Sequence, residues 1–262
     1  MNDKIDGITG KILERYSSVL DNLPPKNKGN LKFGRRYVSV SSIASQYYCE
    51  KKLELQYRYP RPPTKKMLDG IMGHDVVTTS AIPLTREEAY QEALKPRERP
   101  ICIYEIDLAW YHNSVPILGK VDEVWINGGE VSLVSERKFS NRLEIFPSYH
   151  IQAQLYCLGM GEMGFNNYAT KYCIQVYKRS CNSCYQLMEL TCPLCLLETA
   201  DYQCSRGEGR TYIFNFQHEN IISELNWALD FWLGKRATTS TENPAKCNAC
   251  EYATICDSSL VV

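Results

Sequence analysis

The stretch from Val115 to Phe139, VPILGKVDEVWINGGEVSLVSERKF, decides the predicted fold because it holds two hydrophobic runs joined by a turn. The first run reaches Ile126 and the second begins at Glu130, and both are rich in β-branched and aromatic residues. Between them, Gly128 and Gly129 tolerate positive φ angles. The stretch therefore predicts a β-hairpin.

The register of this hairpin decides which side chains share a face of the sheet. A three-residue loop pairs Asp122 with Val134. In that register Asp122 lies on the same face as Glu136 and Lys138. A two-residue loop places Asp122 opposite Leu133 and turns Glu136 to the other face. Diagonal neighbours on adjacent strands lie roughly 7–8 Å apart, close enough for two carboxylates to share a cation. We therefore expect the three-residue loop.

The acidic and basic side chains of the hairpin have the chemistry of a metal-dependent phosphodiesterase. Because successive strand side chains alternate between faces, Glu136 and Lys138 lie side by side. Asp122 and Glu136 would hold Mg²⁺ or Mn²⁺ through oxygen, leaving coordination sites for water and phosphate. Lys138 would orient the attacking water and offset charge that develops on the phosphorane. A surface hairpin with a solvated salt bridge explains these residues, taken alone, equally well.

The composition limits the classes of protein to consider. The chain has 262 residues with 30 basic and 30 acidic side chains, so nucleic-acid binding must come from local basic runs. Two such runs lie at 26–36 and 51–66, and either is also explained as a solvated face. No stretch of about 18 apolar residues and no signal-peptide core are present, so we expect a cytoplasmic protein without a membrane span.

The rest of the sequence alternates helical and strand patterns. An amphipathic helix at 4–20 and a basic linker form an N-terminal segment, 1–36, ahead of a main domain at 37–262. Further helices are expected from Ser41 or Ser42 to about Tyr57, at 66–80, from Thr85, at 147–159 and at 217–233; further strands are expected at 101–111, 168–178, 185–191 and 211–216. This order predicts an α/β fold with a mixed β-sheet flanked by helices.

Twelve cysteines in a reducing compartment indicate metal or cluster binding more than disulfides. Cys247, Cys250 and Cys256 lie close together in a polar C-terminal tail. They need a fourth ligand, and Cys49 is the leading candidate because it stands in a polar stretch. Such a site could hold zinc or an iron–sulfur cluster, and the spacing does not separate the two. Either would join the tail to the N-terminal helices.

A second group of cysteines lies in a cysteine-rich stretch at about 179–206. Its members are Cys181, Cys184, Cys192 and Cys195. A zinc knuckle would use all four, but a strand at 185–191 would hold the two pairs roughly 25 Å apart, at about 3.3 Å per residue. The two interpretations exclude each other, and we favour the strand. Cysteines in apolar runs are expected in the core: Cys102, Cys157 and Cys173.

Five motifs follow one another between Val38 and Cys256: Gly70-x2-Gly73-His74, Gly119-Lys120-Val121-Asp122, Glu136-Arg137-Lys138, Gln152-x3-Tyr156, and one early cysteine with three late ones. In type and order they resemble the motifs of the RecB-like PD-(D/E)xK nucleases. The version with cysteines resembles the CRISPR-associated iron–sulfur exonuclease family. Arg137 departs from the family, which usually has a small or aliphatic residue there. Neither the N-terminal segment nor the stretch 181–204 has a place in the family pattern.

The resemblance implies a restriction-endonuclease-like sheet and a role for each matched residue. His74, Asp122 and Glu136 match the metal ligands, and Lys138 matches the catalytic lysine. Gln152 and Tyr156 share a helix face that would touch the active site and the DNA backbone. The four matched cluster ligands, for a [4Fe–4S] cluster, are Cys49, Cys247, Cys250 and Cys256. By themselves, a lone histidine is more often a core or surface residue, and the helix face could simply pack on the sheet.

The function implied by the resemblance is a metal-dependent DNA exonuclease. It would act on single-stranded DNA or overhangs, 5′→3′, and trim DNA before its capture as a new CRISPR spacer, in company with the CRISPR integrase proteins. Three alternatives stay open. The chain could be a RecB-like iron–sulfur repair exonuclease outside CRISPR, it could be a non-catalytic DNA-binding protein with the same fold and cluster, or it could hold zinc in place of the cluster.

Overall fold

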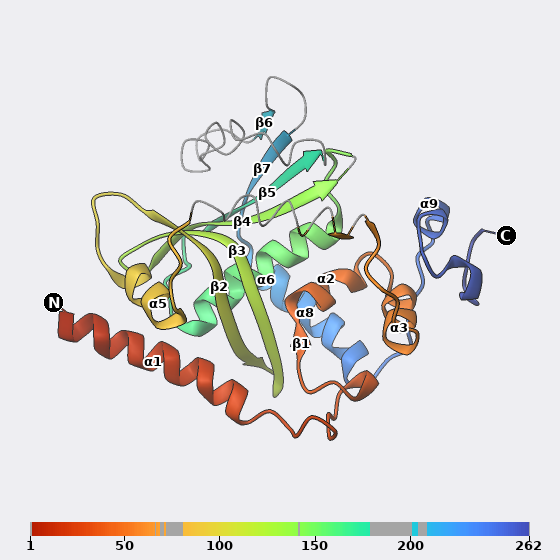
Figure 1. The fold of residues 1–262 in the computed structure, drawn as a ribbon, viewed down its shortest axis with the longest axis horizontal. Helices are drawn as coiled ribbons and strands as arrows, with labels where there is room; N and C mark the ends of the chain where they lie inside the picture. Colours follow the sequence, from red (N-terminus) through yellow and green to blue (C-terminus); the bar gives the residue numbers. More distant parts are fainter. Residues whose placement is uncertain are drawn as a thin grey trace.

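The computed structural model describes residues 2–65, 67–68, 71, 81–140, 142–178, 201–203 and 209–261. Within this part of the chain, seven strands form one mixed sheet with helices packed against it (Figure 1). The strands are β1 (Val38–Ser39), β2 (Ile101–His112), β3 (Val115–Asn127), β4 (Glu130–Ser140), β5 (Lys171–Lys178), β6 (Asp201–Gln203) and β7 (Gly209–Asn215). The predicted α/β class and mixed sheet are confirmed.

The sheet order is β1-β3-β4-β5-β7-β6, and β2 pairs with the other edge of β3. β1 runs parallel to β3 and β4 runs parallel to β5, whereas the remaining pairs are antiparallel. The expected meander of three strands is thus β2, β3 and β4. The short strands β1 and β6 carry no sequence signal long enough for us to have predicted them.

Helices pack against the sheet, and the chain begins and ends with helical segments. They are α1 (Asn2–Asp21), α2 (Val40–Gln46), α3 (Glu50–Arg58), α5 (Arg86–Leu94), α6 (Pro147–Met163), α8 (His218–Trp232) and α9 (Pro244–Asn248), with short 3₁₀ turns at Lys32–Gly34 and Ala253–Ile255. α6 packs against β2, β3, β4 and β5, and α2 and α8 pack against α6. The C-terminal tail with α9 lies beside α3 (Figure 1). No helix in the described residues has both the length and the apolarity to cross a membrane.

Most predicted elements are confirmed, with shifted ends. α1 matches 4–20, α6 begins at Pro147 but ends at Met163 in place of Gly159, and α8 matches 217–233. A capping box explains the start of α5, because the Thr85 side chain accepts from the Glu88 backbone while Glu88 accepts from the Thr85 backbone. The strand expected at 185–191 lies outside the described residues, and so does most of the helix expected at 66–80.

The helix predicted from Ser41 or Ser42 to Tyr57 is wrong, because two helices occupy this stretch. The N-cap is Ser39, whose side chain accepts a hydrogen bond from the Ser42 backbone N–H. The first helix ends at Gln46, and α3 begins after Cys49, which has an extended backbone with φ −174° and ψ 115°. Cys49 is therefore the N-cap of α3 and does not lie inside a helix.

The predicted three-residue loop of the β3–β4 hairpin is also wrong. Asn127 pairs with Glu130, so Gly128 and Gly129 form a two-residue loop, with φ angles of +58° and +85°. The register then shifts, because Ile126 pairs with Val131 whereas the preceding residue of β3 pairs with Leu133. Ser132 is thus the extra residue of a β-bulge.

The bulge places Asp122 and Glu136 on the same face of the sheet, which a two-residue loop without a bulge would not do. Beyond it, Val124 pairs with Val134 and Glu123 pairs with Ser135. In this register Asp122 stands opposite Glu136, and directly opposite residues of an antiparallel pair project from the same face. The hairpin therefore brings the two carboxylates to one face, by a route different from the one predicted.

Candidate functional site

The candidate site lies where α6 packs against the β3–β4 hairpin. β3 supplies Asp122, β4 supplies Glu136 and Lys138, and α6 supplies Gln152 and Tyr156. The two α6 residues are four apart and share a face, as predicted, and that face is turned toward the strands. Gln152 and Tyr156 are buried, with 9 % and 4 % of their surface exposed.

A chain of polar contacts connects these side chains. The Arg137 backbone N–H donates to Asp122 Oδ2 at 2.9 Å, which fixes the Asp122 carboxylate against β4. Lys138 Nζ lies 2.5 Å from Glu136 Oε1 and donates to Gln152 Oε1 at 3.0 Å. Gln152 Nε2 in turn donates to the Tyr156 hydroxyl at 3.2 Å. Glu136, Lys138 and the two α6 residues thus form one line, with Asp122 held beside it.

The environment of Glu136 disfavours its charged form. The side chain is 1 % exposed, and burial, followed by the charge of Asp122, raises its pKa from the usual 4.5 to about 8 although Lys138 opposes the change. Burial also opposes the charge on Lys138, but Glu136 and Asp122 outweigh it, so the pKa of Lys138 is raised. Burial raises the pKa of Tyr156, with Glu136 and Asp122 adding to the effect. The site therefore holds two acids, Asp122 and Glu136, and one nearby ammonium, Lys138, to balance their charge.

A divalent cation fits the donor set that these acids provide. Glu136 Oε2 is buried and has no hydrogen-bond partner among the described residues, a costly state for a carboxylate oxygen. A cation between Glu136 and Asp122 would satisfy that oxygen and relieve the repulsion between the two acids. His74, the third predicted ligand, lies outside the described residues.

The sequence did not reveal the partners of Arg137. Its side chain forms an ion pair with Glu123, and both are buried, at 7 % and 1 % exposed. Arg137 Nε also donates to Gln175 Oε1 at 3.0 Å, and Trp125 Nε1 donates to Glu123 at 2.6 Å. The Arg137 charge, on the face of β4 opposite Glu136 and Lys138, is therefore neutralised. Strand alternation could have suggested this pair, since Glu123 follows Asp122 and Arg137 follows Glu136.

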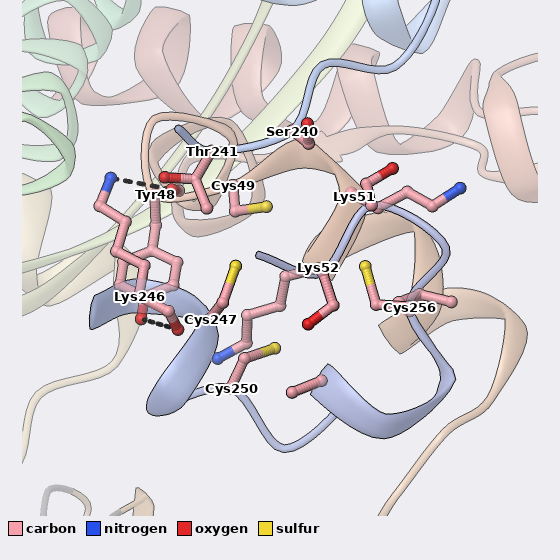
Figure 2. A pocket seen from close by; sticks show the side chains of 14 residues that line it. Tyr48, Cys49, Lys51, Lys52, Ser240, Thr241, Lys246, Cys247, Cys250 and Cys256 are labelled. Carbon is pink, nitrogen blue, oxygen red and sulfur yellow. Dashed lines mark hydrogen bonds between the residues drawn. The ribbon is translucent and has the colours of Figure 1, made fainter. Parts of the chain in front are cut away.

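One cavity between α3 and the C-terminal tail is lined by 14 residues, which include the four cysteines predicted as ligands. Figure 2 shows Cys49 on one side of this space and the tail cysteines Cys247, Cys250 and Cys256 around the rest of it. The Tyr252 backbone N–H donates to Cys250 Sγ at 3.4 Å. The sequence prediction that a residue from the N-terminal part meets three from the tail is thus matched by their placement.

Several cations accompany the thiols. The cavity is also lined by Lys51, Lys52 and Lys246, whose charges would offset those of bound thiolates. Burial raises the pKa of the Cys250 thiol overall, although its hydrogen bond from Tyr252 and the charge of Lys52 oppose the change. Four thiols around one space are a donor set suited to zinc or to an iron–sulfur cluster.

Among the described residues, no three His, Cys, Asp or Glu side chains are arranged so that they could hold a metal ion. The donors are present, and they must adjust when a metal binds. Of the expected core cysteines, Cys157 and Cys173 are fully buried and Cys102 is partly exposed. The four cysteines of the predicted knuckle or strand lie outside the described residues.

The comparisons with known proteins leave the family open. No protein family model matches the chain, and no curated protein matches it. A solved structure described as "Crystal structure of SSO0001" is similar over 96 % of this chain and 96 % of that chain, with 11 % sequence identity and a TM-score of 0.46. A likeness at this level carries no argument about function.

Proposed function

We propose that the chain is a metal-dependent nuclease that hydrolyses phosphodiester bonds of DNA. The observation that supports this most directly is the pairing of Lys138 with the buried Glu136 carboxylate, 2.5 Å apart, on the same face as Asp122. Two adjacent acids and an ammonium are what phosphodiester hydrolysis needs. The acids would hold a cation, and the ammonium would offset the negative charge that develops on the phosphate oxygens.

Each residue has a defined task in this proposal. Asp122 and Glu136 hold Mg²⁺ or Mn²⁺, which when bound would lower the pKa of a water and polarise the phosphoryl oxygens. Lys138 orients the attacking water and offsets the charge that develops on the phosphate oxygens. Gln152 positions Lys138 by accepting its N–H, and Tyr156 in turn accepts from Gln152. Arg137 positions Asp122 through its backbone N–H.

The finer features of the proposal depend on the motif order in the sequence. They are exonucleolytic action on single-stranded DNA or overhangs, 5′→3′ polarity, and trimming of DNA before CRISPR integration, together with integrase proteins. A [4Fe–4S] cluster on Cys49 and the three tail cysteines belongs to the same proposal. The placement of these four cysteines around one cavity supports a metal or cluster there, and zinc is the second candidate.

The test is manganese-dependent release of nucleotides from end-labelled single-stranded DNA. Glu136→Gln keeps the size of the side chain and removes the charge, so the rate should fall by about a hundredfold or more. Glu130→Gln is the matched control, since Glu130 is an exposed acid on the same strand. Equal rates for wild type and Glu136→Gln would show that the nuclease site is elsewhere or that the activity is a contaminant.

The metal in the cysteine cavity needs a separate measurement. Anaerobic purification followed by iron, sulfide and zinc analysis distinguishes the candidates. A brown protein with iron and sulfide in equal amounts supports the cluster. A colourless protein with one zinc per chain contradicts it. Loss of the metal from a Cys247→Ser variant would assign it to this cavity.

A further inference from the structure

Glu50 is a fully buried carboxylate that the proposed chemistry does not use. It follows Cys49 directly, at the start of α3, and none of its surface is exposed. Burying a carboxylate is unfavourable unless it is paired and hydrogen-bonded. A buried acid beside a candidate metal ligand therefore requires strong partners, and Glu50 has them.

Five hydrogen bonds from three residues reach the Glu50 carboxylate. Arg236 donates from Nη1 at 2.8 Å and from Nη2 at 2.5 Å, Thr239 donates from its backbone N–H and its hydroxyl at 2.8 Å each, and Gln46 donates from Nε2 at 2.9 Å. Burial raises the pKa of Glu50, but these donors outweigh burial and lower it overall. The first turn of α3 adds its own favourable dipole.

Two of these residues belong to the segment that follows α8 and leads into the cysteine tail. Arg236 is itself fixed, because its guanidinium lies 3.8 Å from the centre of the Trp227 ring and its Nε donates to the Trp227 carbonyl at 3.1 Å. The backbone of this segment is held as well, since Lys51 N–H donates to the Thr239 carbonyl at 3.1 Å. The start of α3 and residues 236–239 thus form one hydrogen-bonded unit.

We propose that Glu50 is a positioning residue that docks the C-terminal tail against α3 before any metal binds. None of its five hydrogen bonds involves a thiol, so docking does not depend on thiolate coordination. Because Cys49 is the neighbour of Glu50, the docked segment delivers the tail with its three cysteines to the side of Cys49. The cavity then exists before metal binds and the thiols have only to adjust within it, in contrast to small zinc domains that fold only when metal is present.

Only the metal-binding measurement rests on the proposed function, because it requires that the four cysteines bind a metal. The docking itself is measurable without metal. Cys247 is the most useful reporter, since 8 % of its surface is exposed in the docked tail. Alkylation of Cys247 in the chelated, reduced full-length protein, followed by peptide mass spectrometry, reports how often the tail separates from α3.

The variant is Glu50→Gln and the matched control is Glu54→Gln. Glu54 lies one turn later in α3, is also buried, and forms its ion pairs with Arg58 and Lys51 of the same helix, at 2.6 and 3.8 Å. We expect Glu50→Gln to raise the alkylation rate of Cys247 by about tenfold or more, because it leaves Arg236 without a counter-charge. Glu54→Gln should change it by less than about threefold.

The affinity for Co²⁺, followed by thiolate-to-cobalt absorption, should be highest in wild type, slightly lower in Glu54→Gln and lowest in Glu50→Gln. Equal alkylation of Cys247 in wild type, Glu50→Gln and Glu54→Gln would overturn the proposal. If Glu50→Gln does not fold, Thr239→Val removes a single bond to Glu50 and should raise the alkylation rate by about threefold; an unchanged rate there overturns the proposal equally.

Failure of the metal site and failure of the docking role give different results. A wild-type protein that binds neither cobalt nor iron, but in which protection of Cys247 depends on Glu50, would refute the cysteine metal site and leave the docking role standing. A wild-type protein that binds metal, but in which Cys247 reacts as fast as in urea until metal is added, would do the reverse.

Discussion

Replacing Glu136 by glutamine should favour the folded, metal-free protein increasingly as the pH rises. In the unfolded chain the carboxyl has its usual pKa of 4.5, whereas in the folded protein burial raises its pKa to about 8. A folded protein that must ionise this group therefore loses stability as the pH rises. The difference corresponds to about 5 kcal/mol at most, at about 1.4 kcal/mol per pH unit.

The sign follows from which state binds the proton. Below the unfolded pKa, Glu136 is neutral in both states and the stability is fully present. As the pH rises through 4.5 and on to about 8, the unfolded state gives up its proton first, and stability is lost until the folded state ionises as well. Between about pH 5 and about pH 9, wild type should lose about 4 kcal/mol more than Glu136→Gln.

Urea unfolding in the presence of a chelator measures this difference. Both proteins are unfolded at several pH values, and the free energy of unfolding of wild type is subtracted from that of Glu136→Gln. Glu130→Gln, which changes an exposed acid at the start of the same strand, is the control variant. If the curves for wild type and Glu136→Gln run parallel across this range, Glu136 ionises normally and the electrostatic account of the site is wrong.

Three further changes test the packing of the fold, each by urea unfolding. Gly119→Ala should cost about 1–3 kcal/mol, because a Cβ there would lie 2.9 Å from Val40 and 3.1 Å from Tyr156, and Gly10→Ala, with open space around it, should not destabilise. Glu123→Gln should cost about 3–5 kcal/mol, because it leaves Arg137 buried without its counter-charge; a cost below about 1 kcal/mol would show that the pair is not a buried one. Thr85→Ala should cost about 1 kcal/mol through loss of the capping box, and no change would mean that α5 does not need its cap.

The hairpin shows how far local sequence determines the site. Residue type and alternation were enough to predict β3 and β4, because each strand has to bury one set of its side chains. The loop length was not predictable locally, since the turn is held by residues outside it. Gly128 and Gly129 donate their N–H groups to the carbonyls of Lys95 and Ala93, and Val131 donates to Asn166. These contacts come from the end of α5 and from the loop after α6.

The start of α3 shows the same limit for the cysteine cavity. Spacing and polarity were enough to match Cys49 with the three tail cysteines, and the structure places them around one cavity. The break between α2 and α3 was missed, and the contacts made there are with residues distant in the sequence. Gln46, at the end of α2, accepts from Trp232 and donates to the Ala228 carbonyl, both in α8. Local sequence does not show such partners.

Arg137 joins the two faces of β4 and explains why a charged residue can stand between Glu136 and Lys138. Its backbone N–H holds the Asp122 carboxylate on the site face, while its side chain is anchored by Glu123 and Gln175 on the other. A strand fixed on its far face cannot rotate about its own axis, so the directions of Glu136 and Lys138 are fixed by packing that contacts neither of them. Arginine suits this task because its rigid fork of donors can engage two acceptors at once. A small residue at this position would provide the same N–H but would leave Glu123 buried with only the Trp125 N–H and no counter-charge, so Glu123 and Arg137 have to change together.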